Sequence, residues 1–316
     1  MPPLRLLFCG TPHFAVPTLQ HLLSQSDFQV AAVITQPDRP RGRGQQLSSS
    51  PIKEAALAAN IPVHQPEKIR SPETQTLLQN LAPDVIVIIA YGQIIPARLL
   101  PIPQLGWINL HASLLPKYRG AAPINWAIAN GETISGLTTM RIDAGMDTGD
   151  ILLQEKIKIA PDETAPELTK KMSDAGAPLM AETLRGIATG KLTPRPQNHD
   201  QATYAPLLKK EDGRIDWNRP AQEIYNRMRA FDPWPGAYTS FHGQACHLWT
   251  EPFSSRTLTS SPPGTILQEA GQILISCGHA TLLRLLSVKV QGRKQVSAVE
   301  FANGARLTQR ERFDNT

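Results

Sequence analysis

Short, continuous apolar runs alternate along the first part of the chain with segments in which apolar residues recur at helical spacing. The clearest runs cover residues 4–9, 30–35 and 84–90, and the last of these, DVIVIIA, is apolar at consecutive positions. A strand covered on both faces of a parallel sheet has this pattern. Residues 14–23 instead place apolar side chains every three or four positions, as one face of a helix does. The alternation predicts an α/β fold with a Rossmann-like open sheet.

Four of these strands are expected to end at one edge of the sheet, near Cys9, Thr35, Ala90 and His111. Ligands of open α/β sheets bind beyond the carboxyl ends of the strands, so residues that follow these ends are candidates for a site. The first turn, Gly10-Thr11-Pro12, has a single glycine where a dinucleotide-binding turn needs three. We therefore expect no nucleotide cofactor at this turn.

The pattern changes after a long helix predicted over residues 164–189, in which Pro178 should produce a kink. Residues 190–208 are polar and rich in proline, as an interdomain linker would be. Beyond them, short β-like runs at 246–249, 264–268, 272–277 and 281–290 alternate with turn residues, which favours a small β-barrel. The predicted domains are therefore 1–189 and 209–316, joined by the linker.

Composition agrees with this division. A chain of 316 residues exceeds the usual size of one domain. No apolar run is long enough to cross a bilayer, and the N-terminus lacks the pattern of a signal peptide.

Cys9, Cys246 and Cys277 are too few and too scattered for a disulfide framework or a zinc site, which favours a cytoplasmic location. The net charge of +5 is mild support for a polyanionic partner.

The densest group of chemically unusual residues lies between residues 106 and 150. Asn109 and His111, two apart on a predicted strand end, would project from one side. The amide can donate to an oxygen that becomes negative, and the imidazole can accept a proton near neutral pH. Asp147, in a glycine-bounded loop, could orient that imidazole. Taken singly, each residue is better explained by structure: His111 as a hydrogen-bonded strand-end histidine, Asn109 as a turn former, and Asp147 and Asp150 as helix or turn caps.

Taken together, the residues resemble the signature of the folate-dependent formyltransferases. That signature looks like N-L-H-x-S-L-L-P-x-x-R-G-A-A-P followed by a D-x-G-D loop, and the chain has its residues in order from Asn109 to Asp150. The resemblance extends over nearly the whole chain and is again strong at DGRIDW and FDPWPGAY. Within the family, the match is close to the members that formylate methionine on initiator tRNA.

The resemblance implies transfer of a formyl group from 10-formyltetrahydrofolate to the α-amine of that methionine, without a metal or a nucleotide cofactor. Asn109, His111 and Asp147 would be the catalytic trio. Two segments would bind the folate: one borders the tetrahydrofolate, and the other lines the pterin pocket through its backbone. Their residues are Ser113, Leu114, Leu115 and Pro116 in the first segment, and Ile89, Tyr91, Gly92 and Gln93 in the second. The C-terminal barrel would be OB-like and would contact tRNA.

A basic segment, QPDRPRGRGQQLSSSP, follows the second strand. Its prolines and glycines predict a flexible loop without regular structure that leaves Arg39, Arg41 and Arg43 exposed. By composition alone this is a solvated linker. The resemblance instead implies that the three arginines engage the acceptor end of initiator tRNA, and the glycines beside Arg43 would let its guanidinium approach a phosphate or base closely.

Other functions fit parts of the same pattern. A formyltransferase acting on glycinamide ribonucleotide or on an amino sugar nucleotide, or a formyl-folate hydrolase module, would share the first domain. A non-catalytic RNA-binding protein would use the basic segment and the barrel. The basic segment is the main feature that distinguishes the chain from the amino-sugar enzymes. We expect a monomer without a membrane partner.

Overall fold

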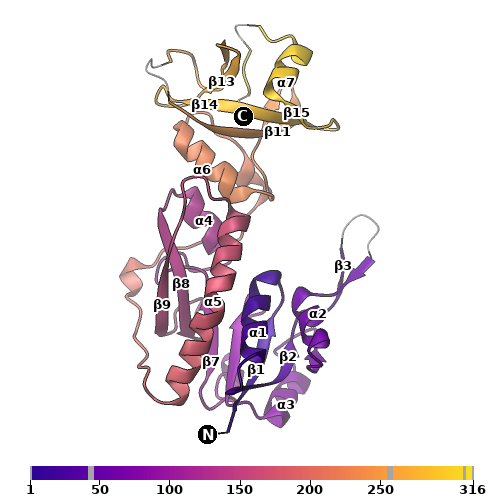
Figure 1. The fold of residues 1–316 in the computed structure, drawn as a ribbon, viewed down its shortest axis with the longest axis vertical. Coiled ribbons are helices and arrows are strands. Elements are labelled where there is room, and N and C mark those ends of the chain that lie inside the picture. Colours follow the sequence, from indigo (N-terminus) through magenta and orange to yellow (C-terminus); the bar gives the residue numbers. More distant parts are fainter. Residues whose placement is uncertain (1, 42–45, 255–258, 309–310, 315–316) are drawn as a thin grey trace. The chain divides into compact units, whose positions relative to one another are not determined.

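The computed structural model describes the chain apart from residues 1, 42–45, 255–258, 309–310 and 315–316 (Figure 1). Contacts divide the chain into two compact units. The first comprises Met1–Pro123, Ile134–Lys158 and Glu167–Pro206, and the second comprises Ile124–Thr133, Ile159–Pro166 and Leu207–Thr316. Two segments that the sequence assigns to the first domain, 124–133 and 159–166, thus pack with the C-terminal part of the chain.

The first unit is built on a seven-stranded sheet. Its strands are β1 (Leu4–Gly10), β2 (Phe28–Ile34), β5 (Val63–His64), β6 (Val85–Ile89), β7 (Trp107–His111), β8 (Ile134–Arg141) and β9 (Ile151–Lys158). They lie in the order β5-β2-β1-β6-β7-β8-β9, parallel as far as β7 and antiparallel from β7 to β9. Every residue of β6 is buried, as its unbroken apolar sequence predicts. The mixed sheet confirms the Rossmann-like α/β fold class.

Helices of the first unit lie between these strands or follow the last of them. They are η1 (His13–Ala15), α1 (Val16–Leu23), α2 (Pro51–Ala58), α3 (Pro72–Leu81), η2 (Ala97–Leu99), α5 (Ala165–Ala188) and η3 (His199–Gln201). A Ser-Pro pair starts both α2 and α3. The hydroxyls of Ser50 and Ser71 accept hydrogen bonds from backbone N–H groups of the first turn. Proline suits the first helical position because a backbone N–H there would have no partner within the helix. Pro178 lies inside α5, which continues through it. Among the described helices, none is both long and apolar enough to span a bilayer.

The basic segment after β2 contains regular structure, and the prediction of a loop without it is wrong. β3 (Arg39–Arg41) and β4 (Gln46–Ser48) form an antiparallel hairpin in which Pro40 lies opposite Leu47. Proline is tolerated there because both strands of a two-stranded ribbon are edges. At the base of the hairpin the Asp38 carboxylate accepts from Lys53 at 2.5 Å and from Gln65 at 2.8 Å. These donors lower the pKa of Asp38 from its ordinary value, Lys53 more than Gln65.

The second unit is an antiparallel sheet with helices beside it. Its elements are α4 (Pro123–Ala129), η4 (Lys210–Gly213), α6 (Ala221–Phe231), β10 (Tyr238–Phe241), β11 (Gln244–Phe253), β12 (Ile266–Glu269), β13 (Gln272–Ser276), β14 (Leu282–Val290), β15 (Val296–Ser297) and α7 (Ala298–Ala305). The strand order is β10-β11-β14-β13-β12, with β15 on β14. Near the end of the chain, Asp314 bridges to Ser240 on β10 and Arg312 bridges to Thr265 beside β12. This segment joins both edges of the sheet, as the predicted barrel requires.

Aromatic side chains fill the core of this unit. Phe241 packs against Phe301 of α7 and against Phe313, with ring centroids 5.2 and 5.7 Å apart. Outside the barrel, α4 is fixed to α6, since Trp126 packs edge-on against Phe231 at 5.6 Å and Asn125 donates to the Ala230 carbonyl at 2.7 Å. These contacts explain why residues 124–133 belong to the second unit. The sequence analysis had not identified α4 or α7.

Candidate active site

The carboxyl end of β7 carries two of the predicted catalytic side chains, Asn109 and His111. In the antiparallel pairing with β8, His111 lies opposite Thr138 and Asn109 opposite Met140. Because the two residues are two positions apart on one strand, their side chains project from the same face of the sheet. His111 is buried and Asn109 is half-buried, so this face lies at the margin of the core.

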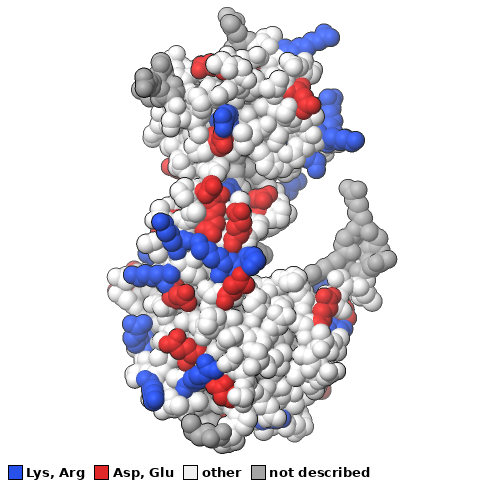
Figure 2. Space-filling model, in the orientation of Figure 1, with Lys and Arg blue, Asp and Glu red and all other residues white. Residues whose placement is uncertain are grey.

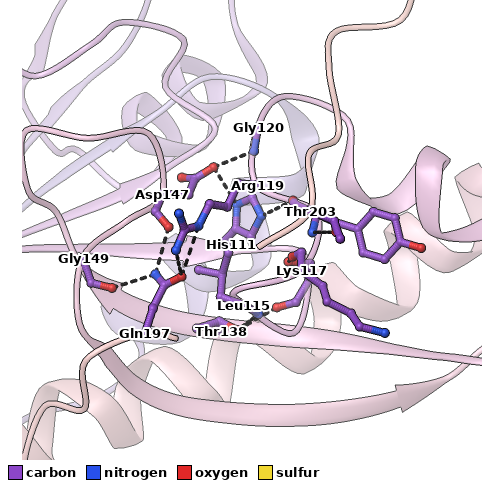
Figure 3. A network of polar contacts seen from close by, with 12 residues as sticks. His111, Leu115, Lys117, Arg119, Gly120, Thr138, Asp147, Gly149, Gln197 and Thr203 are labelled. Carbon is purple, nitrogen blue, oxygen red and sulfur yellow. Dashed lines mark hydrogen bonds and ion pairs between the residues drawn. The ribbon is translucent and has the colours of Figure 1, made fainter. Parts of the chain in front are cut away.

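The two ring nitrogens of His111 have different neighbours (Figure 3). Nε2 lies 2.9 Å from the carbonyl oxygen of Tyr118, and Nδ1 lies 3.6 Å from Oδ2 of Asp147. A carbonyl oxygen can only accept a hydrogen bond, so Nε2 must carry the hydrogen. In the neutral ring Nδ1 then keeps its lone pair and can take up a proton. The imidazolium that forms would have the Asp147 carboxylate as its ion-pair partner.

Asp147 lies in a loop between β8 and β9 that is held by its own side chains. Asp143 accepts from the backbone N–H of Gly145 at 3.0 Å and from the Thr148 hydroxyl at 2.7 Å. Asp147 itself has a left-handed backbone, with φ of 53°, and its Oδ2 accepts from the Gly120 N–H at 2.8 Å. The same carboxylate oxygen therefore faces both a backbone donor and the His111 ring (Figure 3).

The turn after β7, which the resemblance assigns to folate binding, is built by internal hydrogen bonds. The Ser113 hydroxyl donates to the Lys117 carbonyl at 2.6 Å, and the Leu115 N–H donates to the Thr138 hydroxyl at 3.1 Å. Gln154 donates to the Leu115 carbonyl at 2.9 Å. Ser113 and Leu115 are buried, whereas Leu114 and Pro116 are half-buried. The polar groups of this turn thus hold it in the shape that presents the Tyr118 carbonyl to His111.

The second predicted folate segment, after β6, also turns its side chains inward. Ile89 is buried in the sheet, and Tyr91 is buried in the core, where desolvation raises the pKa of its phenol above the ordinary value. The Tyr91 carbonyl accepts from Thr11 and Gln36, and the Gln93 side chain accepts from the Ile69 N–H. Ala90 and Gly92 are exposed and have positive φ. Small residues and backbone therefore form the surface of this turn.

A segment that sequence analysis interpreted as linker contributes to the site. The Thr203 hydroxyl accepts a hydrogen bond from the Tyr118 N–H at 2.8 Å. The Thr203 carbonyl accepts one from the Arg119 N–H, also at 2.8 Å. The buried side chain of Gln197 lies between Arg119 and the Asp147 loop (Figure 3). The contacts place residues up to Pro206 in the first unit. The sequence gives no local sign of this, because each partner lies about fifty or more residues away.

Two of the predicted tRNA-binding arginines, Arg39 and Arg41, lie at the same edge of the sheet as His111, since β3 follows the carboxyl end of β2, which runs parallel to β7. Arg39 is exposed and Arg41 ends β3, while Arg43 falls outside the described residues. On the face drawn in Figure 2, basic and acidic side chains are mixed. The formal net charge of +5 is therefore not gathered in a single patch on that face.

In the part of the chain that the structure describes, no group of three or more His, Cys, Asp or Glu side chains is arranged to hold a metal ion.

Two family models match the chain: the formyl transferase model matches residues 4–184, and the model of the formyl transferase C-terminal domain matches residues 207–306. A methionyl-tRNA formyltransferase of Solibacter usitatus (strain Ellin6076) is 51% identical over 313 residues, which are 98% of each chain. A methionyl-tRNA formyltransferase of Koribacter versatilis (strain Ellin345) is 51% identical over 302 residues, covering 95% of this chain and 96% of the relative.

Solved structures share the fold. The crystal structure of WlaRD, a sugar 3N-formyl transferase in the presence of dTDP and 5-N-formyl-THF, matches with a TM-score of 0.65 and 20% identity. The match covers 92% of this chain and 99% of WlaRD. At this identity the likeness extends to the fold alone.

Proposed function

The chain belongs to the formyl transferase family, and we propose that it uses Asn109, His111 and Asp147 to formylate methionyl initiator tRNA with 10-formyltetrahydrofolate. It is an enzyme, and its acceptor is methionyl-tRNA, since relatives about half identical over nearly the whole chain are methionyl-tRNA formyltransferases. The product, N-formylmethionyl-tRNA, serves translation initiation. The observation that supports the catalytic assignment is the position of the His111 ring between the Tyr118 carbonyl and Asp147.

His111 removes the proton that the attacking amine must lose. The amine nitrogen forms a bond to the formyl carbon, and the bond from that carbon to N10 of the folate breaks, so a proton leaves the amine and one reaches N10. Nδ1 of the neutral ring has the free lone pair, and Asp147 stabilises the imidazolium while it holds the proton. Returning this proton to N10 regenerates neutral His111.

Asn109 stabilises the oxygen of the reacting formyl group. Its side chain lies on the same face of β7 as His111, and its NH₂ group can donate to the negative charge that develops there. The backbone of Asn109 is part of β7, so the position of this residue is fixed before the charge forms.

10-Formyltetrahydrofolate supplies the formyl group. Ala90 and Gly92 are exposed without bulky side chains, while Tyr91 is turned into the core, so the turn of residues 89–93 suits contacts between its backbone and a flat pterin ring. Leu114 and Pro116, both half-buried, offer apolar surface beside His111 for the rest of the cofactor. Ser113 and Leu115 act through the shape of the turn.

Arg39, Arg41 and Arg43 bind the acceptor end of the tRNA, and the C-terminal unit binds the tRNA elsewhere. The hairpin that carries these arginines is anchored at Asp38 by Lys53 and Gln65, so its base has a fixed position. The enzyme works in the cytoplasm as a monomer.

The experiment is to mix the protein with 10-formyltetrahydrofolate and one of three acceptors: methionyl initiator tRNA, the same tRNA uncharged, or an amino sugar nucleotide. The proposal requires N-formylmethionine with the charged tRNA alone. Formylation of the sugar nucleotide instead would favour the amino-sugar activity, and tRNA binding without any product would favour an RNA-binding protein.

A further inference from the structure

Gln197 lies where the two segments that contact the His111 ring meet. One segment contains Tyr118, whose carbonyl faces Nε2, and the other contains Asp147, whose carboxylate faces Nδ1. Gln197 follows α5 in a segment without regular structure, and only 6% of its surface is exposed. A buried amide is costly unless its polar atoms have partners, so its contacts are informative.

Every hydrogen-bonding position of the Gln197 side chain is occupied (Figure 3). Its Nε2 donates both hydrogens, to the carbonyls of Asp147 and Gly149, each at 2.8 Å. Its Oε1 accepts twice from Arg119, from Nη2 at 2.6 Å and from Nε at 3.2 Å. An amide has two donors on one end and two acceptor sites on the other, so glutamine fits this position completely.

Arg119 connects this amide to both neighbours of the histidine. It stands directly between Tyr118 and Gly120 in the chain, and the Gly120 N–H donates to the Asp147 carboxylate at 2.8 Å. Arg119 as a whole is 3% exposed, and its Nη2 also donates to Nδ1 of His199 at 3.1 Å. Gln197 therefore ties the backbone of the Asp147 loop to the side chain of the residue between Tyr118, which contacts His111, and Gly120, which donates to Asp147.

We propose that Gln197 is a positioning residue for formyl transfer, which sets the distance between Asp147 and His111 by joining the 147–149 loop to Arg119. The inference rests on the proposed function. Gln197 does not touch the reacting atoms, so its effect runs through Asp147. A displacement of about 1 Å in a catalytic group can reduce a rate by about 10²-fold, so the loss of this clamp is expected to reduce turnover rather than substrate binding.

The test compares Gln197→Ala and Gln197→Glu with a matched control, Gln201→Ala, which removes an exposed glutamine from the same segment. Glutamate can still accept from Arg119 but has no N–H for the two carbonyls. We expect both Gln197 variants to lose about 10²-fold in kcat, with KM for each substrate within about threefold of wild type. Tetrahydrofolate should bind all three variants with unchanged Kd, and Gln201→Ala should turn over normally.

A double-mutant cycle with Asp147→Asn distinguishes an effect of Gln197 through Asp147 from a general loss of structure. If Gln197 acts through Asp147, then Gln197→Ala costs only a few-fold in kcat when Asp147 is already replaced. Equal losses in both backgrounds, or a loss confined to KM, would overturn the inference. If Gln197→Ala does not fold, the cycle can be measured with Gln197→Glu instead, because glutamate keeps the contact with Arg119.

The two proposals fail in different ways. A wild-type protein that does not formylate methionyl-tRNA contradicts the proposed function. A wild-type enzyme that is active, with Gln197 variants that retain its kcat, contradicts the positioning role alone.

Discussion

The Tyr118 carbonyl oxygen lies 2.9 Å from Nε2 of His111 and thereby fixes the tautomer of the ring. Since that carbonyl can only accept, the hydrogen of the neutral ring is on Nε2 and the basic lone pair is on Nδ1. Nδ1 is the nitrogen that faces Asp147, at 3.6 Å. The Tyr118 carbonyl therefore orients the ring, and the Asp147 carboxylate stabilises its charged form.

Asp147→Asn tests the electrostatic half of this arrangement. Asparagine keeps an oxygen for the Gly120 N–H but has no charge to stabilise an imidazolium. Coulomb attraction at about 4 Å is worth roughly 4 kcal/mol at the effective dielectric of a protein surface, so we expect kcat to fall by up to about 10³-fold while folate binding is kept. Single-turnover rates with methionyl-tRNA measure this, and a loss below about threefold would contradict the role given to Asp147.

Asn109→Ala tests the proposed oxyanion donor. Loss of one such donor costs about 3 to 4 kcal/mol in comparable acyl-transfer sites, so turnover should fall by hundreds-fold with little loss of folate affinity. Asn109→Asp has nearly the same shape but no N–H, and it should be equally slow. Near-normal turnover in either variant would remove Asn109 from the mechanism.

Gly120→Ala tests the close packing beside Asp147. Gly120 has φ of +118°, and a Cβ there would lie 2.7 Å from the Ala205 carbonyl oxygen. Gly190→Ala is a matched control, because it also has a positive φ, +67°, but nothing lies within 4 Å. Positive φ alone costs about 1 kcal/mol, so Gly120→Ala should lower both the melting temperature and turnover well beyond the control. Equal effects of the two substitutions would show that the contact with Ala205 is unimportant.

The hairpin arginines are expected to act through tRNA phosphates. Replacing Arg39, Arg41 or Arg43 by alanine should raise KM for methionyl-tRNA and reduce the slope of log K against log salt concentration by about 0.9 for each lost phosphate contact. Folate affinity should not change. Arg70→Ala, which removes an exposed arginine of the same unit, provides the control. Kinetics that are unchanged across salt would contradict this assignment.

The local sequence pattern was sufficient to predict those helices and strands whose own apolar and capping residues determine their structure. The run over β6 and the polar, capped starts of α2 and α3 need only neighbouring residues to be recognised. The glycine-bounded loop suggested that a carboxylate could reach His111, but only the resemblance singled out Asp147, because no local pattern relates the end of β7 to the loop after β8.

The elements that the sequence did not reveal depend on distant partners. Gln197 is polar in a polar segment, and only Arg119 and the Asp147 loop make it part of the core. The β3–β4 hairpin depends on pairing between strands that are individually rich in turn formers. For α7 a signal was present, since Ser297 and Glu300 form a capping box at its start.

The most direct test of the account is the single-turnover rate of N-formylmethionyl-tRNA formation by His111→Gln beside wild type. The glutamine amide can still donate to the Tyr118 carbonyl, so the turn is kept, but no basic nitrogen faces Asp147. The account predicts a folded protein that binds tetrahydrofolate normally and forms product about 10² to 10⁴ times more slowly. A folded variant that formylates methionyl-tRNA at nearly the wild-type rate would contradict it.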